Sequence, residues 1–505
     1  MKEYDLVVIG SGVGLTIINY GIMAGWKCAL IEDKKIGGTC LTRGCIPSKI
    51  LVYPADIIKE VERAKKIGIE FELKKIDWNL ISQRMWQQIN ESYEIEKGLS
   101  TVKNLDLYKG VSEFTREYTM KVKLNETGEY SNEFKGKRFV IASGAREFIP
   151  PIAGLNEAGF ITSTTFFGEK FPKKLWKSII IIGGGIIAAE FAHIFSSFGV
   201  ETTIVEMLPR LVSTEEPEIS EILEKSMRKH VNIHLNSKAI SVKKENNMKI
   251  VIIENKNGEK KDLIAEEIFL AVGRRSNADL LKVEKTGIET DKQGWIITNK
   301  YLETNKSNIW ALGDANGKFQ FRHKANYEAE ILIQNIFGHS KEKIAVDYSA
   351  VPWAIFTHPQ IAHVGMTQQE AISNGYKIYV AKKKYSEVAK GFALGFDESS
   401  EDDGLFKLIV DEHYRILGAH IIGPYAESLI QPFVYLMNSG FSCTPPHMQS
   451  QIQIKESVIK MPKFLSACSP DAGTIIPIYK SMVIHPSINE VTAWALGNLR
   501  PVNIK

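Results

Sequence analysis

Cys40 and Cys45 are the residues with the clearest chemical potential, and four residues separate them in the run from Gly37 to Lys49. They follow a glycine-rich turn, Gly10-Ser11-Gly12-Val13-Gly14, of the kind that joins a strand to a helix and binds a dinucleotide. A dithiol placed next to a bound dinucleotide indicates thiol–disulfide redox chemistry.

The residues around this turn predict how it is positioned. A buried strand at Leu6–Ile9 precedes the glycines, and Glu32 ends a second apolar strand 20 residues beyond Gly12. In such a unit the glycines let the backbone approach a pyrophosphate at a helix N-terminus, and the acid binds a ribose hydroxyl. We therefore expect a first dinucleotide site built from Gly10, Gly12, Gly14 and Glu32.

A second unit of the same kind begins at Ile179. The strand Ile179–Ile182 leads into Gly183-Gly184-Gly185, and Glu206 closes the next strand. A carboxylate there accepts hydrogen bonds from a ribose diol and repels a 2′-phosphate, which favours NAD(H) over NADP(H). Arg210 can offset that repulsion, so the sequence leaves the coenzyme choice open.

The composition is that of an ordinary globular protein with several domains. The chain has 505 residues, 44% of them hydrophobic and 24% charged, and a formal net charge of +4. No basic block with interleaved aromatic residues predicts nucleic-acid binding, and no signal peptide or membrane span is expected. Five cysteines are too few for a secreted disulfide scaffold, so we expect a reducing, cytoplasmic location. No metal site is predicted.

With two nucleotide sites and a dithiol, the sequence resembles the pyridine nucleotide–disulfide oxidoreductases over almost its whole length. This family includes dihydrolipoamide dehydrogenase, glutathione reductase, mycothione reductase and mercuric reductase. The resemblance implies an α/β fold with two Rossmann-like domains, for FAD and NAD, and a C-terminal α+β dimerisation domain. The expected boundaries are 1–148 for the first part of the FAD domain, 149–272 for the NAD domain, 273–348 for the second FAD part with a central domain, and 349–505 for the dimerisation domain.

The resemblance also assigns cofactor residues. The motifs that carry it include Ile141–Arg146, Ala271–Asn277 and Ala311–Ala315. For FAD the candidates are Gly10, Gly12, Gly14, Glu32, Gly38, Thr39, Lys49, Gly110, Ser143, Gly144, Asp314 and Ala325. For the nicotinamide coenzyme they are Gly183, Gly185, Ile186, Ile187, Glu190, Glu206 and Gly273. Lys49 and Glu190 resemble a family ion pair beside the flavin ring.

Four residues are expected to be catalytic. Cys45 is expected to face the flavin as a thiolate, while Cys40 exchanges with the substrate sulfur. His485 would act as the base, and Glu490, five residues later, would orient its ring. In the family this His/Glu pair reaches the disulfide of the partner subunit, so the resemblance implies a homodimer.

The expected function is FAD-dependent, NAD-linked oxidation of dihydrolipoamide, either as a small-molecule dithiol or as a lipoyl group carried by another protein. The alternatives are a reductase of another low-molecular-weight disulfide, of the mycothione or glutathione kind, and an NADH oxidase or diaphorase. Two departures from the family pattern bear on the substrate. Arg43 lies between the cysteines, where it can lower a thiol pKa, attract an anion or face solvent, and an insert at about 441–482 precedes His485.

Overall fold

The computed structural model describes residues 1–439, 473–479, 483, 485 and 487–502. The chain forms two compact units. The first contains residues 1–61, 71–212 and 230–347, and the second contains 62–70, 213–229 and 348–505. Within the described parts of the chain, no helix is long and apolar enough to cross a membrane.

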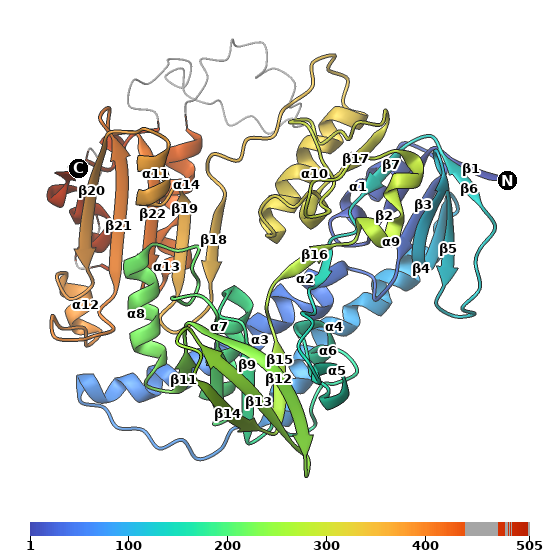
Figure 1. Ribbon diagram of the computed structural model, residues 1–505. Helices are drawn as coiled ribbons and strands as arrows, with labels where there is room; N and C mark the ends of the chain where they lie inside the picture. Colours follow the sequence, from blue (N-terminus) through green and yellow to red (C-terminus); the bar gives the residue numbers. More distant parts are fainter. Residues whose placement is uncertain (440–472, 480–482, 484, 486, 503–505) are drawn as a thin grey trace. The chain divides into compact units, whose positions relative to one another are not determined.

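An eight-stranded sheet organises the first dinucleotide half of the first unit (Figure 1). The central strand β2 is buried at all four positions, as expected for a strand of a parallel sheet that is covered on both faces. In spatial order the strands are β1 (Lys2–Tyr4), β6 (Phe134–Gly136), β5 (Thr119–Leu124), β4 (Leu105–Arg116), β3 (Cys28–Glu32), β2 (Leu6–Ile9), β7 (Phe139–Ile141) and β17 (Ile309–Ala311).

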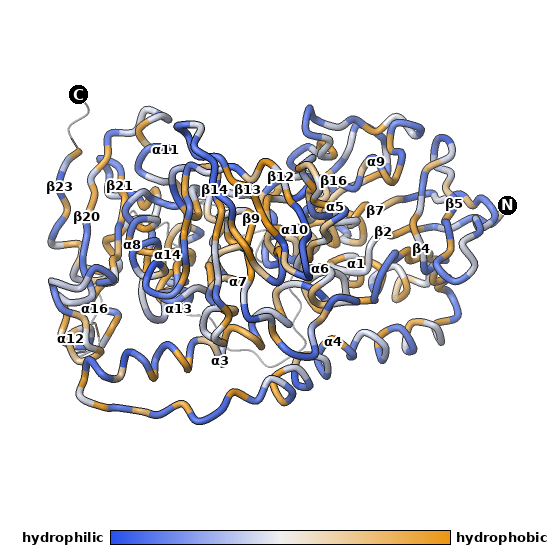
Figure 2. The backbone as a smooth tube through the Cα atoms, turned by 60° about the horizontal axis from the view of Figure 1, so that its bottom comes forward, coloured by the Kyte–Doolittle hydropathy of each residue, from blue (hydrophilic) through white to orange (hydrophobic). Residues whose placement is uncertain are grey.

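Helices connect and flank these strands. Helix α4 shows why such segments are helical, because the Asp77 side chain caps its first turn by accepting a hydrogen bond from the Leu80 amide at 3.1 Å. Hydrophobic and hydrophilic stretches alternate along α4 (Figure 2), as in a helix with one buried face. The helices of this half are α1 (Gly14–Met23), α2 (Gly38–Arg43), α3 (Cys45–Arg63), α4 (Trp78–Ser100), α9 (Ala278–Leu281) and α10 (Arg322–Phe337).

A second parallel sheet carries the other glycine turn. It has four strands, which are β11 (Val231–His234), β10 (Glu201–Val205), β9 (Ser178–Ile182) and β15 (Glu267–Leu270). Helix α7 (Ile186–Ser197) follows β9. The short helices α5 (Leu155–Ala158) and α6 (Ser163–Phe166) precede β9 in the chain. An antiparallel sheet of β12 (Ser237–Glu245), β13 (Met248–Asn255) and β14 (Lys260–Ala265) completes this half.

The chain passes between the two halves through a small antiparallel ribbon. Strand β8 (Ala145–Glu147) lies in the segment that leaves the first sheet, and β16 (Arg274–Ser276) lies in the segment that returns to it. The two strands pair, with Arg275 opposite Arg146. The motifs at 141–146 and 271–277 therefore meet in space, as a crossover and its return must.

The second unit is built on a six-stranded antiparallel sheet. Its strands are β18 (Pro352–Ile355), β19 (Ile361–Gly365), β22 (Ile416–Ile422), β21 (Leu405–Asp411), β20 (Ile378–Lys384) and β23 (Arg500–Pro501). Its helices are α8 (Pro217–Met227), α11 (Gln368–Ser373), α12 (Ala389–Ala393), α13 (Ala426–Leu429), α14 (Gln431–Asn438), α15 (Ile476–Tyr479) and α16 (Glu490–Ala493).

Two segments that the sequence placed in the dinucleotide domains pack with this second unit instead, 62–70 and 213–229. The first is held by Arg63, whose guanidinium lies 4.9 Å from the centroid of the Phe396 ring. The second includes α8, whose Glu218 shares the buried ammonium of Lys407 with Glu216, each at 2.8 Å. Long-range ion pairs of this kind have no signature in the local sequence.

Candidate functional site

The two glycine turns share one backbone feature, which is a glycine with a positive φ close to a carbonyl oxygen of another segment. Gly10 has φ +98°, and a Cβ there would lie 2.2 Å from the carbonyl oxygen of Ala142. Gly183 has φ +115°, and its Cβ would lie 2.3 Å from the carbonyl oxygen of Ala271. Both positions therefore require glycine, for conformation and for space. Each turn lets the chain leave a central strand close to the neighbouring strand and enter a helix.

Glu32 lies at the carboxyl end of β3, where the sequence predicted a ribose ligand. It is 4% exposed, and Ser11 donates to its Oε2 from the backbone amide at 2.8 Å and from the hydroxyl at 2.6 Å. Burial opposes ionisation, yet hydrogen bonds from Asp33 and Ser11 and the charge of Arg43 hold the pKa of Glu32 below its ordinary value. The carboxylate is thus ionised and fixed beside the first glycine turn.

The other FAD candidates come from five further segments. Gly38 and Thr39 begin α2, and Gly110 lies in β4 directly after Lys109, the register partner of Glu32. Ser143 and Gly144 follow β7, Asp314 lies in a 3₁₀ turn at Gly313–Asn316, and Ala325 lies in the first turns of α10. The buried Ser143 hydroxyl has no hydrogen-bond partner among the described residues. An orphaned donor beside an open glycine turn fits a bound polar group such as FAD.

A buried ion pair supports the turn that carries Asp314. Lys324 and Glu328 are 2.9 Å apart with both side chains 0% exposed. Glu328 accepts a hydrogen bond from the Gly313 amide at 2.7 Å, and Lys324 donates to the Asn316 side chain at 2.8 Å. Because each buried polar group is paired, the position of the Asp314 backbone is strongly specified.

The second site has the same plan. Glu206 follows β10, is 8% exposed, and accepts hydrogen bonds from the amides of Gly184 and, at 2.7 Å, Leu208. No described atom would lie within 4 Å of a Cβ at Gly185, so this turn has open space in front of it. Ile186 and Ile187 begin α7, which also carries Glu190, and Gly273 follows β15 with φ +115°. These residues fit a nicotinamide dinucleotide.

Arg210, the residue that left the choice between NAD(H) and NADP(H) open, lies four residues after Glu206 in the sequence. Its Nη1 is buried and has no hydrogen-bond partner among the described residues. A guanidinium nitrogen with no partner is a potential phosphate ligand. The arrangement around Glu206 therefore contains both a fixed carboxylate and a nearby cation.

Cys40 and Cys45 come together because the chain reverses between them. Cys40 lies in α2, Cys45 begins α3, and both carry free thiols. The Cys45 thiol donates a hydrogen bond to Cys40 and lowers the pKa of Cys40 to about 7, with help from the charges of Arg322 and Lys49. The same bond raises the pKa of Cys45. Cys40 is thus the thiol that ionises first, as a nucleophile must.

Arg322 is a contributor that sequence reasoning missed. It lies 282 positions after Cys40 at the start of α10, and no local motif links the two positions. Arg43, by contrast, lies between the cysteines but acts elsewhere. Its Nη1 donates to the Thr42 hydroxyl at 3.1 Å, and its charge lowers the pKa of Glu32.

An ion pair and a hydrogen bond connect α3 with α7. Lys49 Nζ lies 2.7 Å from Glu190 Oε2 and 2.8 Å from Oε1, and the Glu190 side chain is 9% exposed. Two turns further along α3, Asp56 Oδ1 lies 2.7 Å from His193 Nε2. The helix that begins at Cys45 is therefore fixed against the helix that begins at the second glycine turn.

His485 and Glu490 are described in the second unit. Nδ1 of His485 is hydrogen-bonded to Oε1 of Glu490, and the ring centroids of His485 and Trp494 are 6.0 Å apart. The histidine side chain is 64% exposed whereas the glutamate is 0% exposed. A buried carboxylate thus orients an exposed imidazole and leaves Nε2 directed away from it. Most of the insert expected at 441–482 lies outside the described residues.

Comparison with known proteins places these sites in a family. Residues 4–329 match the family described as pyridine nucleotide-disulphide oxidoreductase, and residues 351–455 match its dimerisation domain. Mycothione reductase from Mycobacterium tuberculosis H37Rv is 31% identical over 471 residues, which cover 88% of this chain and 94% of that protein. Dihydrolipoyl dehydrogenase from Chlamydia pneumoniae is 30% identical over 506 residues, which cover 99% and 98%.

Solved structures agree with this assignment. The Cu(II) complex of the HOCl-induced flavoprotein disulfide reductase RclA from Escherichia coli superposes with a TM-score of 0.77 at 26% identity, covering 97% of this chain and 98% of that one. The α/β fold class and the family resemblance predicted from the sequence are confirmed. The family binds FAD and uses NAD(P)H, and the match to the dimerisation domain supports a homodimer. This chain is therefore a flavoprotein disulfide oxidoreductase that belongs to the pyridine nucleotide-disulphide oxidoreductase family.

Proposed function

We propose that this protein oxidises dihydrolipoamide with NAD⁺, giving lipoamide, NADH and a proton. The observation that carries the proposal is the fixed carboxylate of Glu206, which two backbone amides hold at the end of β10. A carboxylate in this place favours a ribose diol over a 2′-phosphate, and the NAD-linked branch of the family is the one that acts on dihydrolipoamide. The relative from C. pneumoniae, which covers 99% of the chain, bears the name dihydrolipoyl dehydrogenase.

The thiol steps follow from the two cysteines. In the oxidised protein Cys40 and Cys45 would form a disulfide. A substrate thiolate attacks Cys40 Sγ, a new S–S bond forms, and Cys45 leaves as a thiolate. The second substrate thiolate then attacks the first substrate sulfur, which closes the lipoamide ring and releases Cys40. The charges of Arg322 and Lys49, which lower the pKa of Cys40, favour its departure as a thiolate in this second step.

Proton transfer is the proposed role of the His/Glu pair. His485 of the partner subunit accepts the protons of the substrate thiols at Nε2, because Glu490 occupies Nδ1. FAD, when bound, supplies two-electron exchange between the dithiol and NAD⁺. Lys49 contributes a positive charge beside the flavin position that the family resemblance implies, and Glu190 holds it there.

The test is NAD⁺ reduction by dihydrolipoamide with purified, FAD-loaded protein, followed as the appearance of NADH. We expect turnover that disappears in Cys45→Ser, while NADH still reduces the flavin of that variant. A wild-type protein whose flavin is reduced by NADH but which does not turn over dihydrolipoamide would refute the proposal.

A second candidate is reduction of a low-molecular-weight disulfide of the mycothione kind. Two observations favour it: the 31% identity with mycothione reductase and the unpartnered Nη1 of Arg210, which can bind a 2′-phosphate. The same cysteines would then work in the opposite direction. NADPH oxidation dependent on mycothiol disulfide, without dihydrolipoamide turnover, would establish this candidate.

A further inference from the structure

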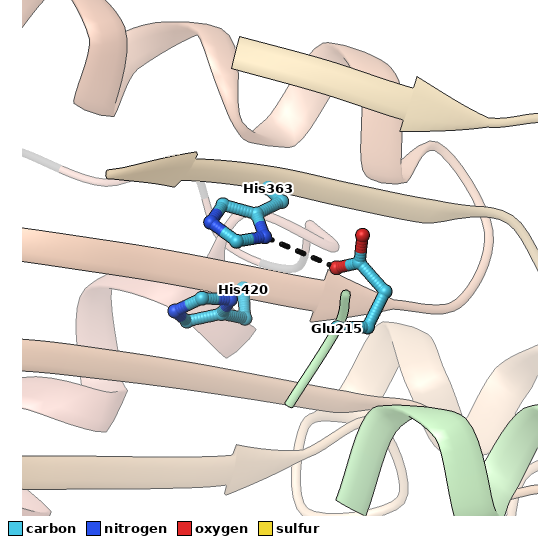
Figure 3. Close-up of side chains that lie close together, drawn as sticks. All are labelled: Glu215, His363 and His420. Carbon is cyan, nitrogen blue, oxygen red and sulfur yellow. Dashed lines mark hydrogen bonds and ion pairs between the residues drawn. The ribbon is translucent and has the colours of Figure 1, made fainter. Parts of the chain in front are cut away.

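Glu215, His363 and His420 form a buried cluster in the second unit (Figure 3). Glu215 lies just before α8, His363 lies on β19, and His420 lies on β22. Their side chains are 0%, 1% and 0% exposed. One potential ligand atom from each residue lies within 4.8 Å of the other two. None of the three belongs to the redox or dinucleotide sites.

The sheet itself brings the two histidines together. His363 and His420 are direct register partners in the antiparallel pair of β19 and β22, so their side chains emerge on the same face. Their ring centroids are 4.2 Å apart. Two neighbouring strands can thus present two imidazoles on one face of a sheet as ligands to a single ion.

The outer nitrogens of both rings are already committed. His363 Nε2 lies 2.8 Å from the carbonyl oxygen of Gly365, and His420 Nε2 lies 3.0 Å from that of Met366. Because a carbonyl only accepts, both Nε2 atoms must carry the proton. This is the arrangement of metal-binding histidines, whose second nitrogen donates to a backbone carbonyl and so fixes the ring.

The Nδ1 atoms of the two rings are the remaining potential ligand atoms. Because Nε2 of His420 donates to the Met366 carbonyl, the neutral ring carries its lone pair on Nδ1. That Nδ1 is buried with no partner among the described residues. His363 Nδ1 points to Glu215 Oε2 at 3.1 Å. A proton on His363 would satisfy Glu215 but would leave His420 Nδ1 without any partner.

A hydrogen bond fixes the orientation of the Glu215 carboxylate. The Trp353 indole N–H donates to Glu215 Oε1 at 2.6 Å, which leaves Oε2 directed at the histidines. The neighbouring buried ammonium of Lys407 is shared by Glu216 and Glu218, each at 2.8 Å. Glu215 therefore takes its compensating charge from the side of the two histidines.

We propose that Glu215, His363 and His420 bind a divalent zinc ion through Oε2 and the two Nδ1 atoms. Two imidazoles and a carboxylate form a ligand set that zinc accepts, at roughly 2.0–2.2 Å from the metal. Ligand atoms on a tetrahedral ion lie about 3.3 Å apart, so a modest contraction of the cluster closes the site. One position remains for a water molecule.

The ion would serve the structure rather than the redox reaction. It joins the segment before α8 to the adjacent strands β19 and β22 of the six-stranded sheet, from which that segment is distant in the sequence. Because the three ligands are excluded from solvent, the site offers no route for a substrate. Zinc bound there would stabilise the docking of residues 213–229 on the sheet.

The experiment compares zinc content in the wild-type holoprotein and in Glu215→Gln, both purified without chelator from cells grown with zinc sulfate. Glutamine keeps the size of the side chain and an acceptor for Trp353. We expect about one zinc per chain in the wild type and a loss of roughly tenfold or more in the variant. His413→Ala, which removes an exposed histidine between β21 and β22, should retain the metal.

X-ray absorption at the zinc edge of the oxidised wild-type protein gives a readout that does not depend on the folding of a variant. We expect nitrogen and oxygen neighbours at about 2.0–2.1 Å and no sulfur shell. FAD content and the mass of the native dimer confirm that Glu215→Gln is folded. Absence of zinc from the wild type, equal zinc in Glu215→Gln, or sulfur ligands at about 2.3 Å would each overturn the proposal.

Discussion

Lys49 and Glu190 form an ion pair at 2.7 Å that joins two helices from positions 141 residues apart in the chain. Lys49 lies one turn after Cys45 on α3, and Glu190 lies one turn after the second glycine turn on α7. The pair therefore couples the position of Cys45, the proposed redox cysteine, to that of the second glycine turn. The ion pair can act through the positive charge of Lys49 or through the packing of the two helices, and two variants can separate these roles.

Lys49→Met should slow reduction of the flavin by NADH on the order of tenfold or more, because it removes a cation from the proposed flavin site. Stopped-flow absorbance of the flavin measures this rate. The matched control is Asp56→Ala, which removes the hydrogen-bond partner of His193 and so breaks the other α3–α7 contact without removing a lysine or arginine charge. Equal slowing in both variants would mean that the Lys49 pair acts only through helix packing.

The hydrogen bond between the two cysteines predicts a difference between Cys45→Ser and Cys45→Ala. The pKa of Cys40 is about 7, and the donor from Cys45 is the largest cause. A serine hydroxyl can still donate, whereas alanine cannot, so the pKa of Cys40 should rise in Cys45→Ala only. Because the thiolate forms above the pKa, its share at pH 7 should fall from about half toward a few per cent.

Alkylation by iodoacetamide as a function of pH checks this expectation, since only the thiolate reacts. The double variant Cys40→Ser/Cys45→Ser provides the background from the other cysteines, of which Cys28 is buried. The profile should have its midpoint near pH 7 in Cys45→Ser and at a higher pH in Cys45→Ala. Identical profiles would show that cations, rather than Cys45, set the reactivity of Cys40.

The coenzyme preference should follow Glu206. The wild type should use NADH at least about tenfold better than NADPH, because a fixed carboxylate repels the 2′-phosphate. Glu206→Ala should narrow this ratio mainly through a higher KM for NADH. Steady-state kinetics with both coenzymes measures it. If the wild type instead prefers NADPH, and Arg210→Ala loses activity with NADPH, then Arg210 binds the 2′-phosphate. The predicted preference for NADH would then be wrong.

Mixing of two inactive variants tests whether the site is shared between subunits. Cys40→Ser and His485→Gln should each be inactive in thiol turnover. If His485 serves the cysteines of the partner subunit, the mixed dimer contains one intact site. Random reassociation of equal amounts should then restore about one quarter of the wild-type activity. If both groups served the same subunit, the mixture would stay inactive although the mixed dimer had formed, as mass spectrometry would show.

Much of the machinery is local in sequence and could be predicted from it. Gly10 and Gly183 each follow an apolar strand, and each is followed about 20 residues later by an acid, Glu32 or Glu206. Steric limits on the backbone allow few other readings of such a pattern. The His485–Glu490 contact also spans only five residues. In all these cases the residues that interact are positioned by one short unit of chain.

Other relationships depend on how distant segments fold together. Nothing in the local sequence pairs Arg322 with Cys40, and residues 213–229, which the sequence assigned to a dinucleotide domain, cluster with the six-stranded sheet. Charge acts through space, so a helix that arrives from a remote part of the chain can set a thiol pKa without any motif.

The sequence by itself determined the family, the two glycine turns with their acids, and the candidate redox dithiol, because each of these depends on short-range backbone geometry. Only the tertiary structure decided which side chains meet across strands. His363 and His420 are 57 residues apart and become neighbours through the register of β19 and β22, and Glu215 reaches them from a third segment. Strand register is set by the packing of the whole sheet, so a cluster built on it has no counterpart in the linear pattern of residues.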